Sequence, residues 1–224
     1  VLFDKYGADT LRFYLLYVSP PWLPTKFDEE GLREVESKFL RSIRNIYNFF
    51  SLYANTDDIN PKEFHVPVED RPMIDRWLLS RYHHLLASIE EDMKTYELSR
   101  IMRNISDFVI EDFSNWYIRR NRRRFWSETV DADKQAVYNT TYEVLVGLSK
   151  IIAPFRPFMA EELYQNLVGK ESVHLELYPE ADEGFFLDAL EDKMRLVQQI
   201  VTMGRAARER AQIKVRQALQ SIAV

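Results

Sequence analysis

The residue types best suited to chemistry gather in one stretch near the middle of this 224-residue chain, N-W-Y-I-R-R-N-R-R-R-F-W at positions 115–126. Positions 116–126 hold five arginines and no acid, although the chain as a whole has a net charge of −5. Arginine donates paired hydrogen bonds to phosphate oxygens, and aromatic rings stack on unpaired bases. The stretch therefore favours a surface that binds RNA. The residues expected to contact RNA are Trp116, Arg119, Arg120, Arg122, Arg123, Arg124 and Trp126.

A structural explanation of the same stretch stays open at this point. The dipole of a helix favours cations at its C-terminal end by about 0.3–1 kcal/mol each, and arginines also pair with acids of neighbouring helices. Five arginines exceed what the dipole requires. If pairing were the whole explanation, residues 116–126 would be buried against acids and would bind no RNA. The chain would then resemble a helical scaffold for protein interactions.

A second basic set lies on the helix predicted from about residue 28 to residue 54. Arg41, Arg44 and Asn45 share its polar side, and Arg and Asn side chains can pair with base edges. An ordinary solvated helix face has the same pattern, and that simpler interpretation is favoured for this set. The basic patch at 205–216 is a weaker candidate still, because charged helix ends are common.

The sequence lacks the common catalytic and metal-binding patterns. It has no Cys, which excludes disulfides, thiolate catalysis and Cys-ligated zinc within this chain. Its 4 histidines form no H-x-x-x-H pair, and Glu171 with His174 gives only half of a two-metal bundle motif. No glycine-rich phosphate loop and no nucleophile elbow is present. We therefore expect no catalytic residue, metal or cofactor in this chain, and a freestanding helical enzyme is the weakest alternative.

Helical spacing dominates the elements that must position these residues. Apolar side chains recur at three- and four-residue steps, and prolines at 20–24, 154 and 157 interrupt the pattern. Asp28 and either Asp131 or Asp133 suit helix N-caps. Only 173–178 and 213–216 alternate apolar and polar residues, which predicts brief extended segments. The predicted fold is all-α, an antiparallel bundle of about seven helices with minor short strands.

Three parts are expected along the chain: a connector at 1–27, a helical bundle at 28–180, and a C-terminal helix with the start of a junction to a further domain at 181–224. No apolar run approaches the roughly 20 residues of a membrane span. The first residues lack the pattern of a secretory signal. Both ends are typical of a domain excised from a longer protein. We expect a cytoplasmic monomer that does not associate with membranes.

Four separated motifs resemble the class I aminoacyl-tRNA synthetases for aliphatic amino acids. The segment after the catalytic core of these enzymes is similar to D-K-Y-G-A-D-T-L-R-F-Y-L-L at 4–16 with S-P-P-W at 19–22. The isoleucyl branch in particular resembles the stretch at 115–126, Y-E-V-L-V-G-L-S-K-I-I-A-P-F-R-P-F-M-A-E-E-L-Y at 142–164, and I-K-V-R-Q at 213–217. Ala218 stands where that branch would have Pro, which affects only the junction beyond this domain.

The resemblance implies an α-helical domain that binds the anticodon stem-loop of a tRNA, with 1–27 following the catalytic core of a parent ligase. The parent would activate isoleucine with ATP and Mg²⁺ and transfer it to tRNA. The HIGH-type and KMSKS-type motifs that hold ATP are absent here, so this piece is expected to bind RNA and to catalyse nothing alone. Its other partners would be the catalytic and C-terminal domains of the parent. Valyl- or leucyl-specific domains are the nearest alternatives.

Overall fold

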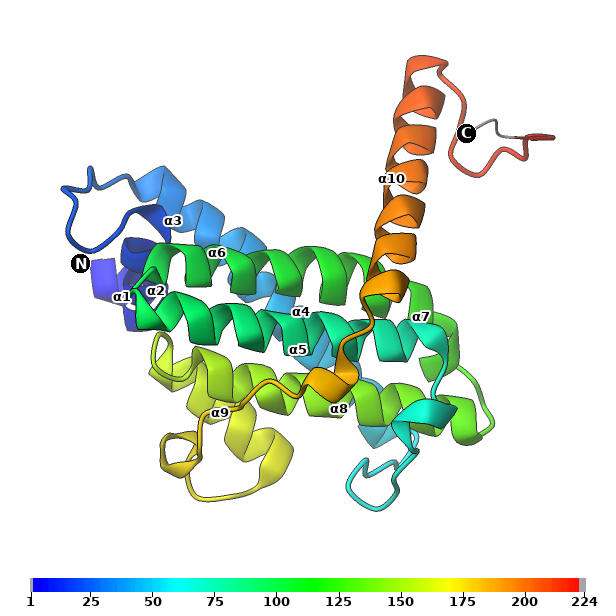
Figure 1. Ribbon diagram of the computed structural model, residues 1–224, viewed down its shortest axis with the longest axis horizontal. Coiled ribbons are helices and arrows are strands. Elements are labelled where there is room, and N and C mark those ends of the chain that lie inside the picture. The colour runs from blue at the N-terminus through cyan, green and yellow to red at the C-terminus, as the bar shows by residue number, and fades with distance from the viewer. Residues whose placement is uncertain (1, 222–224) are drawn as a thin grey trace. The chain divides into compact units, whose positions relative to one another are not determined.

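The computed structural model describes residues 2–221 and divides the chain into two compact units, Val1–Phe186 and Leu187–Val224 (Figure 1). Both units are helical, and no strand occurs between residues 2 and 221. The all-α prediction is therefore confirmed. The residues expected to form a connector, 1–27, lie in the first unit, because their helices pack against later ones. The first unit also continues six residues past the expected end of the bundle at residue 180.

Neither of the two segments predicted to be extended forms a strand, so the prediction of minor short strands was wrong. Val173–Leu175 forms a single 3-10 turn, η4. The Ser172 hydroxyl accepts the N–H of His174 at 3.1 Å, and the Glu161 carboxylate accepts the N–H of Val173 at 2.9 Å. Side-chain acceptors thus hold this segment locally. Residues 214–217 close a second turn, in which the N–H of Gln217 donates to the carbonyl of Lys214.

The chain begins with two short helices, α1 (Leu2–Tyr6) and α2 (Ala8–Val18). Gly7 joins them with a φ of 77°, a conformation that costs glycine little. The proline-rich loop ends α2, as predicted. Phe13 of α2 is buried and stacks on Phe39 of the next helix, with ring centroids 4.4 Å apart. This contact attaches α2 to the bundle.

A long helix follows in three joined parts. They are α3 (Glu29–Val35), the π-helical η1 (Glu36–Leu40) and α4 (Arg41–Thr56). Asp28 is the N-cap, and its carboxylate accepts the N–H groups of Glu30 and Gly31 at 3.1 and 3.3 Å. The cap predicted from sequence is therefore confirmed. The apolar side of the helix packs inward through buried Leu32, Phe39, Ile43, Ile46 and Phe50.

Three antiparallel rods form the centre of the first unit (Figure 1). The first rod is α5 (Met73–Lys94) and the third is α8 (Ala132–Ile152), with Asp131 as its N-cap. The second rod joins α6 (Leu98–Asp107), the π-helical η3 (Phe108–Ile118) and α7 (Arg119–Phe125). The residues at both junctions keep right-handed helical dihedrals, so the second rod continues without a break. Its C-terminal part, α7, contains the arginine run.

The rest of the first unit covers this centre. Helix α9 (Pro157–Val168) packs against α8 and ends at Gly169, whose φ is 75°. The chain then returns to α5, where two consecutive histidines stack on two consecutive phenylalanines. The ring centroids lie 4.2 Å apart for His83 and Phe185, and 4.0 Å apart for His84 and Phe186. Two further 3-10 turns are η2 (Val68–Asp70) and η5 (Glu183–Phe185).

The second unit consists mainly of α10 (Asp188–Arg210). None of the residues of α10 is buried. The helix ends in a turn in which the guanidinium of Arg208 donates to the carbonyls of Lys214 and Gln217 at 3.1 and 2.8 Å. Among the described residues, no helix has the length and apolar content needed to cross a membrane.

Candidate nucleic-acid interface

Helix α7 divides its residues between the core and the solvent. Phe125 is fully buried and meets two rings edge-on, those of Phe49 at 5.1 Å and Tyr138 at 5.0 Å. Asn121, one turn earlier, is also buried and donates to the carbonyl of Tyr117 at 2.9 Å. With this side of the helix fixed inward, four of the five arginines are exposed. They are Arg119, Arg120, Arg122 and Arg123.

Three of these exposed arginines have no partner within residues 2–221. No hydrogen bond or ion pair in that part of the structure involves Arg119, Arg122 or Arg123. Residues three and four apart are neighbours on a helix surface, so the three guanidinium groups occupy adjacent positions. Like charges at such spacing destabilise a helix by about 0.2–0.5 kcal/mol per pair. An anion bound across the three side chains would remove that repulsion.

Arg120 has a different environment, because it lies over the indole of Trp116. The carbon centre of its guanidinium is 3.5 Å from the ring centroid, an arrangement that attracts the cation electrostatically. Trp116 itself is only 8 % exposed. The predicted stacking of a base on Trp116 therefore has little free ring to use. Arg120 covers that ring and presents its own plane instead.

The guanidinium of Arg124 is fully engaged in hydrogen bonds within the protein. Its Nη1 and Nη2 donate to the two carboxylate oxygens of Asp75 at 2.6 and 2.8 Å, and its Nε donates to the carboxylate of Asp133 at 3.0 Å. Further bonds reach the side-chain oxygen of Asn121 at 3.1 Å and the carbonyl of Asp133 at 2.7 Å. A guanidinium has five N–H groups, and these five bonds engage all of them. Arg124, predicted to contact RNA, thus has no donor left for a phosphate and holds the bundle together.

The surroundings of this ion pair show why it is structural. The side chain of Asp75 is 0 % exposed and that of Arg124 is 13 % exposed. Burial alone would lower the pKa of Arg124, but the hydrogen bonds and charge of Asp75 outweigh it and raise that pKa. The buried hydroxyl of Tyr117 also donates to Asp75 at 2.8 Å. Burial, and then the charge of Asp75, raises the pKa of Tyr117 well above its usual value, so this hydroxyl keeps its proton.

Trp126 follows α7 as its C-cap residue and is 53 % exposed. Its backbone N–H donates to the carbonyl of Arg122 at 3.0 Å, which fixes the backbone of Trp126 one turn after Arg122 and Arg123. A half-exposed indole in a fixed position is a platform on which an unpaired base can stack. Trp126 therefore offers an exposed ring at the C-terminal end of the helix that carries the unpartnered arginines.

The second predicted set lies on α4. Arg41, Arg44 and Asn45 are all exposed there. The contact of Phe49 with Phe125 fixes α4 beside the end of α7, and Asn45 is one turn, about 6 Å along the axis, before Phe49. The charge of Arg44 also acts on Arg156, which lies between α8 and α9. Burial is the main cause that lowers the pKa of Arg156 to about 10; the charge of Asp9 opposes this shift, and the charge of Arg44 adds to it.

Two buried residues that sequence analysis missed, Asp75 and Asn121, orient α7 and so decide which of its arginines are exposed. Asp75 lies 49 positions before Arg124 in the chain, and no local sequence pattern predicts their pairing. Asn121 was detectable, because it is the one uncharged residue between Arg119 and Arg124. An uncharged residue inside a run of arginines indicates the inward side of the helix.

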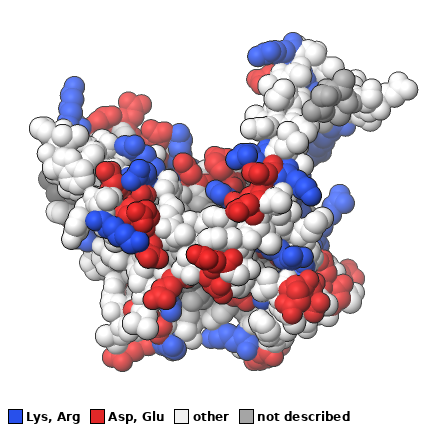
Figure 2. All heavy atoms as spheres, in the orientation of Figure 1, with Lys and Arg blue, Asp and Glu red and all other residues white. Residues whose placement is uncertain are grey.

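The charge of the surroundings limits where RNA can approach. Figure 2 shows acidic side chains spread over the face in view, with Lys and Arg among them and no continuous basic surface. Other cations of the first unit are paired with acids, as in Arg81 with Asp112 at 3.0 Å and Arg71 with Glu143 at 2.8 Å. In the part of the chain that the structure describes, no group of three or more His, Asp and Glu side chains could hold a metal ion.

Comparison with known proteins adds independent information. A family described as the anticodon-binding domain of tRNA ligase matches residues 75–223. Isoleucine–tRNA ligase of Porphyromonas gingivalis is 45 % identical over 221 residues, which cover 98 % of this chain and 19 % of that protein. Isoleucine–tRNA ligase of Dehalococcoides mccartyi is 44 % identical over 227 residues, 99 % of this chain and 22 % of that protein. The chain spans about a fifth of the length of these relatives.

Among solved structures, the chain is similar in fold to a leucyl-tRNA synthetase of Agrobacterium radiobacter, crystallised as a ternary complex with tRNA and LeuAMS. The TM-score is 0.60 at 17 % sequence identity, over 83 % of this chain and 21 % of that one. At this identity the likeness shows a shared helical fold.

Proposed function

The chain belongs to the family of anticodon-binding domains of tRNA ligases, and on that premise we propose that the exposed arginines of α7 hold the anticodon stem-loop of an isoleucine tRNA. The observation that carries the proposal is the set of three guanidinium groups, Arg119, Arg122 and Arg123, without partners among the described residues. In a chain of net charge −5, these groups form a local site of positive potential.

The proposed division of roles follows from exposure and pairing. Arg119, Arg122 and Arg123 bind backbone phosphates, since each has its full set of donors available. Trp126 stacks on an unpaired base of the loop, and Arg120 offers a guanidinium plane supported by Trp116. Arg41, Arg44 and Asn45 on α4 are weaker candidates for reading base edges. Arg124 acts only through the position of α7.

The isoleucine assignment rests on the relatives. Two isoleucine–tRNA ligases match nearly the whole chain at 44–45 % identity. We propose that the parent of this chain joins isoleucine to its tRNA in the cytoplasm, with ATP and Mg²⁺ held by other parts of the parent. The chain itself supplies recognition. The solved leucyl-tRNA synthetase complex contains tRNA, which supports an RNA role for this fold, whereas its 17 % identity gives no support for leucine specificity.

The test is a fluorescence anisotropy titration of the 224-residue chain with three labelled anticodon stem-loops, those of isoleucine, valine and leucine tRNAs. We expect the isoleucine stem-loop to bind most tightly, with a difference of roughly 1–3 kcal/mol for each base that is read directly. Equal affinity for all three would refute selective recognition. Absence of saturable binding to any of them would refute the RNA function and favour the protein-interaction scaffold.

A further inference from the structure

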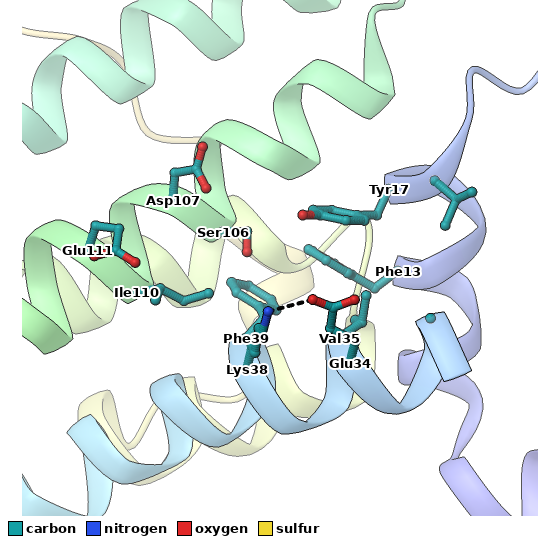
Figure 3. A pocket seen from close by; sticks show the side chains of 12 residues that line it. Phe13, Tyr17, Glu34, Val35, Lys38, Phe39, Ser106, Asp107, Ile110 and Glu111 are labelled. Atoms are coloured by element: carbon teal, nitrogen blue, oxygen red, sulfur yellow. Dashed lines mark hydrogen bonds and ion pairs between the residues drawn. The ribbon is translucent and has the colours of Figure 1, made fainter. Parts of the chain in front are cut away.

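A cavity of about 540 Å³ opens between α2, the α3–η1 helix and the second rod, on the part of the bundle formed by Phe13, Phe39 and Ile110 (Figure 3). It lies away from the arginine run, and none of its lining residues is expected to contact RNA. Its chemistry is the opposite of that of the RNA surface, since it combines an aromatic wall with a rim of carboxylates.

The aromatic wall is a stack of three rings. Phe13 lies between the other two, with its centroid 5.9 Å from that of Tyr17 and 4.4 Å from that of Phe39. Both phenylalanines are buried, whereas Tyr17 is partly exposed. Figure 3 shows the rings on one side of the cavity, facing the side chains of Ser106, Asp107 and Glu111. The guanidinium of Arg156 already lies over the two phenylalanine rings, 5.7 Å from the centroid of Phe13 and 6.0 Å from that of Phe39. The ring of Tyr17 is therefore the part of the wall that is open to a further cation.

The rim carries more negative than positive charge. Glu34, Asp107 and Glu111 line the cavity, and Lys38 is the one cation that the structure places in the lining. Lys38 already pairs with Glu34, as the dashed line in Figure 3 shows. Asp107 has no hydrogen bond or ion pair within residues 2–221. Partial burial, and then the charge of Glu111, raises the pKa of Asp107.

A hydroxyl completes the lining. The side chain of Ser106 belongs to a residue that is only 5 % exposed, yet no hydrogen bond of its hydroxyl occurs in the described part of the chain. Figure 3 shows the hydroxyl pointing into the space between the aromatic wall and the helix that carries Asp107. The hydroxyl can therefore donate to or accept from a molecule that enters the cavity. This hydroxyl is a second polar group, independent of the carboxylates, directed at whatever fills the cavity.

The cavity also lies where two π-helical segments meet. Lys38 and Phe39 belong to η1, and Ile110 and Glu111 belong to η3, which packs against it. π-Helical geometry is rare and is found most often at functional sites. The α3–η1–α4 helix and the second rod thus depart from α-helical geometry on the two sides of this cavity.

We propose that the cavity is a docking site for an arginine side chain presented by another polypeptide segment. A guanidinium lying flat on Tyr17 would have the carboxylates of Asp107 and Glu111 and the hydroxyl of Ser106 as acceptors. A guanidinium offers five N–H groups in a plane, which suits several acceptors beside a ring better than the three donors of a lysine ammonium. The acidic rim repels phosphate, so RNA is not the occupant.

The test uses ¹⁵N-labelled chain and three short peptides, acetyl-Gly-Arg-Gly-amide, its lysine counterpart and its citrulline counterpart. Citrulline keeps the shape of arginine and lacks its charge. We expect the arginine peptide to shift the amide resonances of residues 106–111 with a Kd on the order of 1 mM. The lysine peptide should bind several-fold more weakly, and the citrulline peptide should produce no saturable shift. Similar shifts with the arginine and citrulline peptides would overturn the proposal.

Asp107 and Glu111 are exposed and have no ion pair within residues 2–221, although Glu111 accepts a hydrogen bond from the Asn115 amide at 3.3 Å. The double variant Asp107→Asn/Glu111→Gln removes both charges and should weaken binding of the arginine peptide at least tenfold. The matched control, Glu90→Gln/Glu91→Gln on α5, removes two exposed charges outside the cavity and should leave binding unchanged. Wild-type affinity in the first variant would overturn the proposal. So would shifts of the same amides by the anticodon stem-loop.

Discussion

Two neighbouring arginines of α7 provide a sharp test, because the structure gives them opposite roles. Arg124→Met removes all five hydrogen bonds of a guanidinium that is 13 % exposed and leaves Asp75 buried without its cation. Arg123→Ala removes a side chain that is exposed and has no partner within residues 2–221. The first change should destabilise the fold, and the second should weaken RNA binding.

The magnitude for Arg124 follows from its burial. Loss of one member of a buried ion pair costs about 3–5 kcal/mol, since the remaining charge is uncompensated. Tyr117 still donates to Asp75 in the variant, so the lower end, about 3 kcal/mol, is expected. For a chain of this size each kcal/mol shifts the melting temperature by roughly 2–4 °C, which gives a fall of roughly 6–12 °C. Arg123→Ala should change the stability by no more than about 0.5 kcal/mol.

Urea unfolding followed by circular dichroism measures the first effect, and a titration with the isoleucine stem-loop at several salt concentrations measures the second. Arg123→Ala should lower the slope of log affinity against log salt by roughly one unit. Adding Asp75→Asn to Arg124→Met should restore part of the lost stability, because the buried charge is then gone. The two roles would be refuted if Arg124→Met were as stable as Arg123→Ala, or if it lowered the salt slope by one unit while fully folded.

Three further predictions follow from single positions. Trp126→Ala should weaken stem-loop binding by about 1–3 kcal/mol with unchanged melting, since the half-exposed indole loses a stacked base; unchanged affinity in the anisotropy titration would contradict this. Gly147→Ala should lower the free energy of unfolding in urea by about 1–3 kcal/mol, because a Cβ there would overlap the hydroxyl of Tyr82, and Tyr82→Phe should relieve part of the loss. Hydrogen bonds, first from Tyr164 and then from two lysines, lower the pKa of Glu176 to about 2. The stability that Glu176 gives to the fold is therefore complete above its ordinary pKa of about 4.3 and is lost as the pH falls towards 2. Glu176→Gln should flatten that part of the curve of urea midpoint against pH. A curve of unchanged steepness would contradict this role of Glu176.

Most of the helical frame was predictable, because its signals are local. The caps at Asp28 and Asp131 and the breaks at the prolines are properties of a few adjacent residues. The π-helical segments η1 and η3 were not predictable, since their sequences fit an α-helical pattern equally well. The alternation at 173–178 was misleading, because acceptors on Ser172 and Glu161 hold a turn there.

The candidate interface was predictable as a segment and not residue by residue. Composition alone singles out the arginine run. It cannot separate Arg124 from Arg123, because the separation depends on Asp75, which is distant in sequence and reaches α7 only in the folded bundle. Sequence also does not reveal that Trp116 is buried, because its burial depends on how the second rod packs in the folded bundle. Pairings between residues that are distant in the chain could therefore not be predicted from the sequence.

The central claim is that Arg119, Arg122 and Arg123 bind phosphates of the anticodon stem-loop. This binding is tested by measuring how the affinity for the stem-loop depends on salt, for the wild type and for the variant with alanine at all three positions. The control is Lys94→Ala, which removes an exposed cation that already pairs with Glu90 and Glu91. The triple variant should keep its stability and lose roughly two to three units of salt slope, while Lys94→Ala should lose none. A triple variant with the affinity and salt slope of the wild type would show that these three arginines do not bind phosphates.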